Sequence, residues 1–315
     1  MKEKFLVVGA FGQVGTELVP FLQKHFGKNS VVAVDNRKIK PNFKAKIEIA
    51  SVLNKKAISR LVEKYKITWI VNLASLLSVK SETVPEKAFS INLLGLKNTL
   101  EIAKDKKIKL FWPSSIAVFG PTTPKEKTPQ DTIVEPTTMY GITKRAGELL
   151  CQYYYLKWGV DVRSLRYPGL LDYKTEPSMG TTEYVKHMFY QGIKNNFYEC
   201  PLKPNTTLPM MYMEDAILAT IKLILAKPEK IKVRTSYNLA SFSFAPKDLF
   251  EELKKYLPKL KVKYKVDPKI QKIANSWPKS IDDSRAQKDW GWKPKYSFEE
   301  TVKIMYENIK RKLEK

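Results

Sequence analysis

Short apolar runs alternate with amphipathic segments along the first half of the chain. The apolar runs are rich in Val, Ile, Leu, Phe and Trp, as is typical of strands buried on both faces of a parallel sheet. They lie at residues 5–8, 31–34, 69–73, 110–112 and 162–165. Apolar residues recur at helical spacing between them, at residues 13–26, 55–64, 85–103 and 140–157. The alternation predicts an α/β fold built on a doubly wound parallel sheet.

The order of the elements changes after Leu171. Helical patterns at residues 184–190, 214–225, 247–256 and 298–313 are now separated by short strand patterns at 236–239 and 262–264. We therefore predict a first domain over residues 1–172 and a smaller α+β domain over residues 173–315. Some segments of the second half are expected to return to the first sheet.

Composition excludes several classes of protein. Hydrophobic residues make up 43% of the 315 positions, enough for a sizeable core. No apolar run approaches the roughly 20 residues that cross a bilayer, and Met1–Phe5 leads to no signal-peptide cleavage site. Two cysteines and two histidines are too few for a disulfide framework or a zinc site. We predict a cytoplasmic protein with no membrane segment and no metal.

The charge balance points toward polyanions, because 56 Lys and Arg against 32 Asp and Glu give a net charge of +24. The lysines are scattered, and pairs such as 55–56, 106–107 and 254–255 form no stripe interleaved with aromatic residues. A solvated basic surface is therefore the preferred interpretation. Nucleic-acid binding stays open as an alternative that we do not favour.

A glycine motif directly follows the first apolar run and opens the first helix. Residues 9–15 have the sequence GAFGQVG. Gly9 permits the strand-to-helix turn, Gly12 allows a pyrophosphate to approach the backbone, and Gly15 allows the helix to pack closely on the sheet. The motif predicts a Rossmann-type dinucleotide site in the first domain.

Asp35 ends the second predicted strand, about 20 residues beyond the glycines. A carboxylate at this place accepts hydrogen bonds from the adenosine ribose and repels a 2′-phosphate. We therefore predict NAD as the cofactor, rather than NADP. Arg37 and Lys38 follow Asp35 and can tolerate a phosphate, which weakens the discrimination.

Tyr140 and Lys144 are four residues apart on a predicted helix, so both side chains lie on one face of it. An ammonium near a phenol lowers the phenol pKa from about 10 toward neutral pH, and the phenolate then accepts a proton. Ser115 lies at the carboxyl end of a strand, where ligands of such sheets bind, and can hydrogen-bond a reacting hydroxyl. The three residues predict catalysis at a carbon that bears a hydroxyl.

Together these motifs resemble the extended short-chain dehydrogenase/reductase family, which includes sugar-nucleotide epimerases and dehydratases. Residues 73–75 (LAS), 92–98 (NLLGLKN) and 165–169 (LRYPG) are similar to further landmarks of that family. The resemblance implies a homodimer in which helices such as 140–157 pair. Cofactor contacts are implied or predicted at Gly9, Phe11, Gly12, Gln13, Val14, Gly15, Asp35, Asn36, Ser51, Val52, Leu73, Ala74, Ser75, Asn92, Tyr140, Lys144, Tyr167 and Pro168.

Within the family, the second half looks most similar to the short-chain type of L-threonine 3-dehydrogenase. Residues 180–184 (GTTEY) resemble that subgroup's GTTDY element, with Glu183 in place of Asp. Residues 208–212 (LPMMY) and 276–278 (SWP), the latter followed by 282–284 (DDS), resemble two more of its elements. The resemblance implies NAD-dependent oxidation of L-threonine to 2-amino-3-oxobutanoate, which feeds formation of glycine or aminoacetone.

A small zwitterion fits the side chains of these segments. Glu183 can accept from the substrate ammonium, and the hydroxyls of Ser78, Thr181 and Thr182 can donate to its carboxylate. Trp277 is either an apolar lid on the substrate or an anchor in the core. The predicted substrate contacts are Ser78, Ser115, Tyr140, Gly180, Thr181, Thr182, Glu183 and Trp277.

Two other functions remain as alternatives. A sugar-nucleotide 4-epimerase or dehydratase uses the same cofactor, but pyrophosphate sites recruit arginines. The second half contains only Arg234, Arg285 and Arg311. A non-catalytic family member that binds nucleic acid has no use for the intact set of Ser115, Tyr140 and Lys144.

Overall fold

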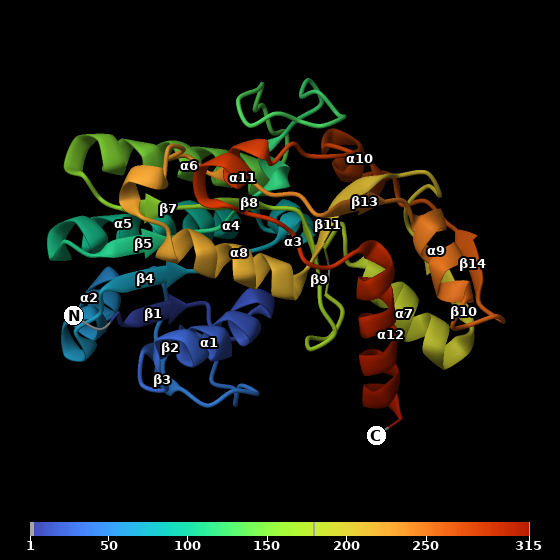
Figure 1. The fold of residues 1–315 in the computed structure, drawn as a ribbon, viewed down its shortest axis with the longest axis horizontal. Helices are drawn as coiled ribbons and strands as arrows, with labels where there is room; N and C mark the ends of the chain where they lie inside the picture. The colour runs from blue at the N-terminus through green and yellow to red at the C-terminus, as the bar shows by residue number, and fades with distance from the viewer. Residues whose placement is uncertain (1–2, 179, 315) are drawn as a thin grey trace.

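Six parallel strands form the central sheet of the computed structural model, which describes residues 3–178 and 180–314 (Figure 1). Their order is β3-β2-β1-β4-β5-β7. The strands are β1 (Phe5–Val8), β2 (Val31–Asp35), β3 (Lys46–Ile49), β4 (Trp69–Asn72), β5 (Lys109–Phe111) and β7 (Val162–Arg163). The order steps outward from β1 in both directions, which confirms the predicted doubly wound sheet.

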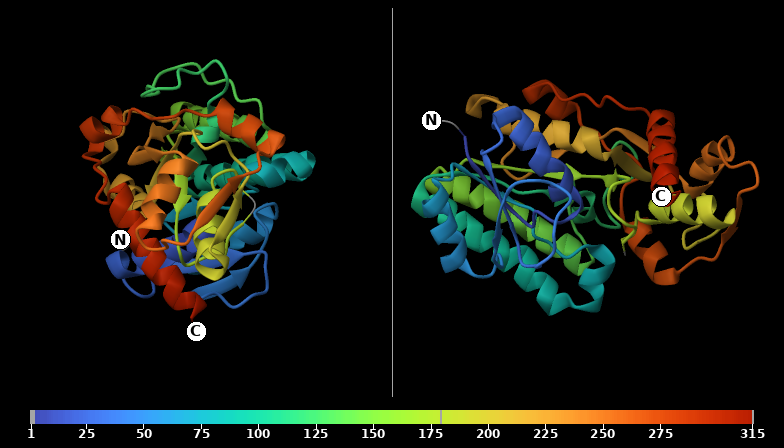
Figure 2. Two further views of the ribbon diagram at one scale, coloured as in Figure 1. Left: turned by 90° about the vertical axis from the view of Figure 1, so that its right-hand side faces the viewer. Right: turned by 90° about the horizontal axis from the view of Figure 1, so that it is seen from below.

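Helices cover both faces of this sheet (Figure 2, right). One face carries α1 (Gln13–Phe26) and α8 (Met213–Leu225), and the other carries α2 (Lys55–Tyr65), α5 (Gly95–Lys106) and α6 (Met139–Trp158). Alternate residues of β1 point to opposite faces, so Phe5 and Val7 join one core cluster while Leu6 and Val8 join the other. The nearly continuous apolar strands of the sequence are explained by this double burial.

Three expectations for the first half differ from the structure. The strand expected at residues 162–165 is divided into β7 and a second strand, Leu165–Tyr167, which belongs to another sheet. Strand β3 was not expected, because it is an edge strand with the sequence KIEI and three of its four residues are exposed. The helix expected at residues 85–103 is divided into α4 (Pro85–Phe89), a π-helical turn (Ser90–Leu94) and α5. The wider turn brings the Asn92 side chain to the loop after β4, where Leu76 N–H donates to Asn92 Oδ1 at 2.8 Å.

Two small sheets connect the halves of the chain. In the first, β8 (Leu165–Tyr167) lies between β6 (Ser114–Ser115) and β12 (Tyr237–Asn238). In the second, β11 (Leu208–Tyr212) lies between β9 (Gly169–Leu171) and β13 (Phe242–Phe244). Because β12 and α8 come from beyond residue 172 and pack against first-half elements, both halves contribute to the layers around the Rossmann sheet.

The remaining second-half elements gather at one end of the molecule, at right in Figure 1. They share a hydrophobic core to which Phe189, Leu249, Ile273 and Met305 contribute, and which also includes first-half residues such as Tyr140. These elements are α7 (Tyr184–Asn195), β10 (Phe197–Cys200), α9 (Pro246–Lys254), β14 (Lys261–Tyr264), α10 (Pro268–Ser276) and α12 (Phe298–Leu313). Short helices complete the chain: α3 (Ser78–Thr83), α11 (Ser284–Trp290) and 3-10 turns at Ile116–Val118 and Pro228–Lys230. Across the residues described, the helices are all too short or too polar to cross a membrane.

Candidate active site

A cavity of about 230 Å³ lies where the glycine loop, the end of β6, the start of α6 and the start of α7 meet. Segments far apart in the sequence supply its wall, so it brings predicted cofactor, catalytic and substrate residues together. The predicted residues that line it are Gly9, Gly12, Gln13, Val14, Gly15, Leu73, Ser75, Ser78, Ser115, Tyr140, Lys144, Tyr167, Pro168, Gly180, Thr181, Thr182, Glu183 and Trp277.

Other predicted cofactor residues lie outside this cavity: Phe11, Asp35, Asn36, Ser51, Val52, Ala74 and Asn92. Asn92 is buried behind Ser75, whose hydroxyl donates to Asn92 Oδ1 at 3.1 Å. The sequence analysis missed some lining residues, namely Leu77, Pro113, Ser114, Ile116, Gly169 and Leu170. Each of them adjoins a segment that holds predicted site residues, so their position next to those motifs was the available signal.

The glycine loop has the geometry that a pyrophosphate requires. Gly9 has φ +80°, and a Cβ there would lie 2.7 Å from the backbone nitrogen of Ala74. A Cβ on Gly15 would lie 2.4 Å from the carbonyl oxygen of Ala10. Helix α1 begins at Gln13, and its N-cap Gly12 makes no side-chain capping bond, so the first-turn amides stay available for an anion. The residues present therefore fit a dinucleotide.

Asp35 is buried at the end of β2 and is held by two neighbours. Phe11 N–H donates to its Oδ2 at 3.0 Å, and the guanidinium of Arg37 donates from Nε to Oδ1 at 2.9 Å and from Nη2 to Oδ2 at 3.1 Å. Burial raises the carboxyl pKa, but these hydrogen bonds outweigh it and lower the pKa below its usual value. Asp35 is thus an ionised carboxylate joined to the glycine loop, with Arg37 as its counterion.

Ser115, Tyr140 and Lys144 lie together at the end of β6 and on the first turns of α6. The helix begins after Thr138, whose hydroxyl accepts from Gly141 N–H at 3.1 Å. Lys144 Nζ donates to Pro113 O at 2.6 Å and lies 5.6 Å from the centre of the Tyr140 ring. The predicted helical face is therefore formed, and it points at the cavity.

Burial moves the pKa values of Tyr140 and Lys144 in opposite directions. Loss of solvation raises the pKa of Tyr140 to about 12, although a hydrogen bond with Ser115 acts to lower it. The lowering toward neutral pH that was expected from Lys144 is therefore not found in the ligand-free chain. The same loss of solvation lowers the pKa of Lys144 to about 7, although the nearby Cys151 and Glu148 act to raise it. With a pKa of about 7, Lys144 changes its charge near neutral pH. Tyr140 has a high pKa, so its phenol ionises and acts as a base only when a positive charge lies beside it.

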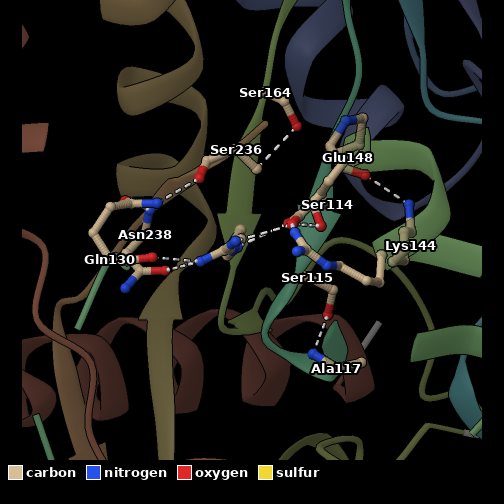
Figure 3. A network of polar contacts seen from close by, with 12 residues as sticks. Ser114, Ser115, Ala117, Gln130, Lys144, Glu148, Ser164, Ser236 and Asn238 are labelled. Carbon is tan, nitrogen blue, oxygen red and sulfur yellow. Dashed lines mark hydrogen bonds and ion pairs between the residues drawn. The ribbon is translucent and has the colours of Figure 1, made fainter. Parts of the chain in front are cut away.

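A buried polar network lies directly behind these residues (Figure 3). Glu148, one turn beyond Lys144, accepts from Ser114 Oγ at 2.7 Å and forms an ion pair with Arg166 at 2.8 Å. Arg166 also donates to Asn238 Oδ1 at 3.1 Å. Ser114 precedes Ser115 in β6, so the network fixes the strand that carries the candidate catalytic serine. Sequence reasoning did not single out this network, because its members lie on elements that are distant along the chain.

The opposite wall of the cavity is polar where a substrate would lie. The hydroxyls of Ser78 and Thr181 are 3.2 Å apart and come from different halves of the chain. Glu183 Oε2 accepts from Ser178 N–H at 2.8 Å and lies 3.1 Å from Lys186 Nζ. The buried Trp277 also lines the cavity, and its indole Nε1 has no hydrogen-bond partner within residues 3–178 and 180–314. Hydroxyls, a carboxylate and an aromatic ring therefore surround one small volume.

Sequence comparison places this site in a known family. The profile of the NAD dependent epimerase/dehydratase family matches residues 5–240. The mitochondrial L-threonine 3-dehydrogenase of Bos taurus is 40% identical over 306 residues, which cover 96% of this chain and 82% of that protein. An uncharacterized epimerase/dehydratase of Staphylococcus haemolyticus is 42% identical over 313 residues, 98% of both chains.

Solved structures give the same result. The holo form of an L-threonine dehydrogenase from Cupriavidus necator has a TM-score of 0.95 and 43% identity, covering 97% of this chain and 99% of that one. An L-threonine dehydrogenase from Clostridium difficile also has a TM-score of 0.95, with 42% identity over 99% of this chain and 98% of that one. Members of the extended short-chain type that resemble this chain include L-threonine 3-dehydrogenases. The chain therefore belongs to the NAD-dependent epimerase/dehydratase family.

Proposed function

We propose that this protein oxidises L-threonine at its secondary hydroxyl to 2-amino-3-oxobutanoate, with NAD as the hydride acceptor. One observation carries the proposal: the cavity that holds Ser115, Tyr140 and Lys144 also holds Glu183 and the paired hydroxyls of Ser78 and Thr181. A proton acceptor and groups complementary to a small zwitterion thus share one site. The threonine dehydrogenases among the relatives agree with this choice of substrate.

The chain's own residues would orient the alcohol and take its proton. Ser115 Oγ hydrogen-bonds the substrate hydroxyl, and Tyr140 Oη accepts the hydroxyl proton as the carbon–oxygen bond becomes a carbonyl. When bound, NAD supplies the positively charged nicotinamide that takes the hydride from the same carbon and favours the ionised form of a neighbouring phenol. Lys144, in its ammonium form near Tyr140, stabilises the phenolate. One proton and one hydride leave the substrate, as a two-electron oxidation requires.

Oxidation of threonine and sugar epimerisation differ in the net fate of the hydride. A dehydrogenase accumulates NADH, whereas an epimerase returns its hydride in every turnover. We expect absorbance at 340 nm to grow with NAD and L-threonine and to stay flat with UDP-sugars. The opposite result, sugar conversion without NADH and no reaction with threonine, would identify an epimerase instead.

We further propose that α6 pairs with a second copy of the chain. Its outer face carries a row of exposed apolar residues at helical spacing, Ile142, Leu149, Tyr153 and Leu156, the last of which is 72% exposed. Leu156→Lys should shift the mass in solution from dimer to monomer at micromolar concentration, because the apolar interface would then have to bury a charge on each copy. A wild-type protein that is monomeric at that concentration contradicts the dimer. The cytoplasmic location remains a prediction from sequence.

A further inference from the structure

Buried polar contacts run from the glycine loop to the substrate wall of the cavity. At one end, Gln13 Nε2 donates to Asp172 Oδ2 and, at 3.4 Å, to Leu170 O. From there, Asp172 Oδ2 contacts Lys186 Nζ at 3.2 Å, and Lys186 Nζ lies 3.1 Å from Glu183 Oε2. Gln13 is the first residue of α1, and Glu183 is the N-cap residue of α7. The contacts therefore join the glycine loop to the carboxylate proposed to bind the substrate.

The middle of this connection is fixed in place. Asp172 Oδ1 accepts from Thr175 N–H at 2.8 Å and from Thr175 Oγ1 at 2.9 Å. Lys186 Nζ also donates to Thr175 Oγ1 at 3.1 Å. The side chains of Asp172, Lys186 and Glu183 are 1%, 3% and 6% exposed, so solvent has little access to them. Charged groups buried to this extent hold their geometry, because an unpaired partner would be costly.

The cluster also has a charge that suits the substrate. Two carboxylates, of Asp172 and Glu183, face one ammonium, of Lys186, so one negative charge remains in excess next to the cavity. A neighbouring pair, Glu17 with Lys174, is neutral in sum and leaves that excess unchanged. An entering ammonium group is the cation that balances it.

We propose that Asp172 and Lys186 are positioning residues that couple the two ligands, so that an occupied cofactor site raises the affinity for threonine. The inference rests on the proposed function. A dinucleotide held by the first-turn amides of α1 fixes the start of that helix, and with it Gln13. Gln13 holds Asp172, Asp172 holds Lys186, and Lys186 sets the Glu183 carboxylate at the cavity wall. Because coupling between sites is reciprocal, threonine tightens cofactor binding by the same factor.

The test measures that factor without turnover, using NADH and L-threonine, which cannot react with each other. Fluorescence titration gives the Kd of NADH alone and with saturating threonine for wild type, Gln13→Ala and Asp172→Asn. We expect threonine to tighten NADH binding at least five-fold in wild type and less than two-fold in both variants. Gln13→Ala removes no charge, so it gives a result even if Asp172→Asn does not fold.

Lys174→Met is the matched control, since it breaks the Lys174–Glu17 ion pair, which also joins α1 to the segment after β9 but does not reach Glu183. In this variant, threonine should tighten NADH binding by the same factor as in wild type. In steady state, Lys186→Met should raise the KM for threonine at least ten-fold with kcat changed less than three-fold, and Lys186→Arg should restore most of the affinity.

Three outcomes would overturn the coupling. In the first, threonine leaves the Kd of NADH unchanged in wild type. In the second, it tightens NADH binding as much in Gln13→Ala as in wild type; in the third, Lys186→Met has an unchanged KM for threonine. If wild type reduces NAD with threonine in any of these cases, the proposed function stands and only the coupling is wrong. If wild type neither binds threonine nor reduces NAD with it, both proposals are wrong.

Discussion

The carboxylate of Glu148 and the guanidinium of Arg166 form a two-point ion pair, from Nε to Oε1 at 2.8 Å and from Nη2 to Oε2 at 2.9 Å. Both side chains are at most 3% exposed. Glu148 lies one turn beyond Lys144 on α6, and Arg166 directly precedes Tyr167 in the cavity wall. The pair therefore ties α6, the helix that carries Tyr140 and Lys144, to β8, the strand that leads into the second half.

Replacing one member of the Glu148–Arg166 pair should lower the free energy of unfolding more than replacing both members. Glu148→Met leaves the guanidinium of Arg166 buried without a counterion, which we expect to lower the free energy of unfolding by about 3–5 kcal/mol. Glu148→Met combined with Arg166→Met should be less destabilised than the sum of the single variants. Urea denaturation of the four proteins measures the coupling, and additive effects would show that the pair is not the source of the stability.

Tyr140→Phe should lower turnover by roughly 10²–10⁴-fold and leave NAD affinity nearly unchanged. The phenyl ring keeps the packing and removes only the hydroxyl that accepts the proton. Tyr155→Phe is the control, because Tyr155 is on the same helix but does not line the cavity. Steady-state rates decide: a Tyr140→Phe enzyme with more than about half of the wild-type turnover would require another base.

The preference for NAD should depend on both members of the Asp35–Arg37 pair. Asp35→Ala removes the ribose acceptor and releases Arg37 to face a 2′-phosphate, so the NAD/NADP ratio of kcat/KM should fall. Arg37→Ala keeps the carboxylate and removes the cation, so the same ratio should rise. Titration with both cofactors measures the two ratios, and variants that leave the ratio unchanged would make the pair purely structural.

Glu183 should set the affinity for the substrate ammonium. Losing a charge-assisted hydrogen bond of about 1.5–3 kcal/mol in Glu183→Gln should raise the KM for threonine roughly ten- to a hundred-fold. Glu183→Asp keeps the charge and should retain most activity, while NAD binding should barely change in either variant. If the Gln and Asp variants use threonine equally well, the Glu183 carboxylate does not bind the substrate and only contacts Ser178 N–H and Lys186.

Lys144 should make the ligand-free protein more stable as the pH rises above neutral. Its pKa is about 7 in the folded chain and 10.5 when unperturbed, so between these values the unfolded chain binds more protons. Stability therefore increases with pH in that window, by at most about 1.4 kcal/mol per pH unit for one group. Urea midpoints from pH 7 to pH 9 should show a smaller slope in Lys144→Met. An equal slope in both proteins would mean that the ammonium is not desolvated.

Much of the fold was predictable because the segments that are apolar in the sequence are the ones buried in the structure. The first-half strands are buried on both faces, so β1, β2 and β4 are visible as apolar runs. The helix at Met139–Trp158 was expected at residues 140–157, which differs by one residue at each end. Strand β3 and the π-helical turn at Ser90–Leu94 were not, because an exposed edge strand lacks an apolar run and hydrophobic periodicity does not report a one-residue widening.

The sequence by itself determined which residues are candidates for chemistry. The spacing of the glycines, of Tyr140 and Lys144, and of Asp35 relative to the loop is local, and local spacing fixes which side chains share a turn or a helical face. The motifs that contain these residues carried the resemblance to the NAD-dependent family, and the family comparison confirmed it. The roles assigned to single residues remain predictions.

Tertiary structure alone decided which of these groups are paired and desolvated. Lys186 meets Asp172 only because α7 begins beside the segment after β9, and Glu148 meets Arg166 only because α6 packs beside β8. The low pKa of Lys144 likewise depends on its loss of solvation in the packed chain. Burial and ion pairing depend on distances between residues that are remote along the chain, and such distances exist only once the elements have packed.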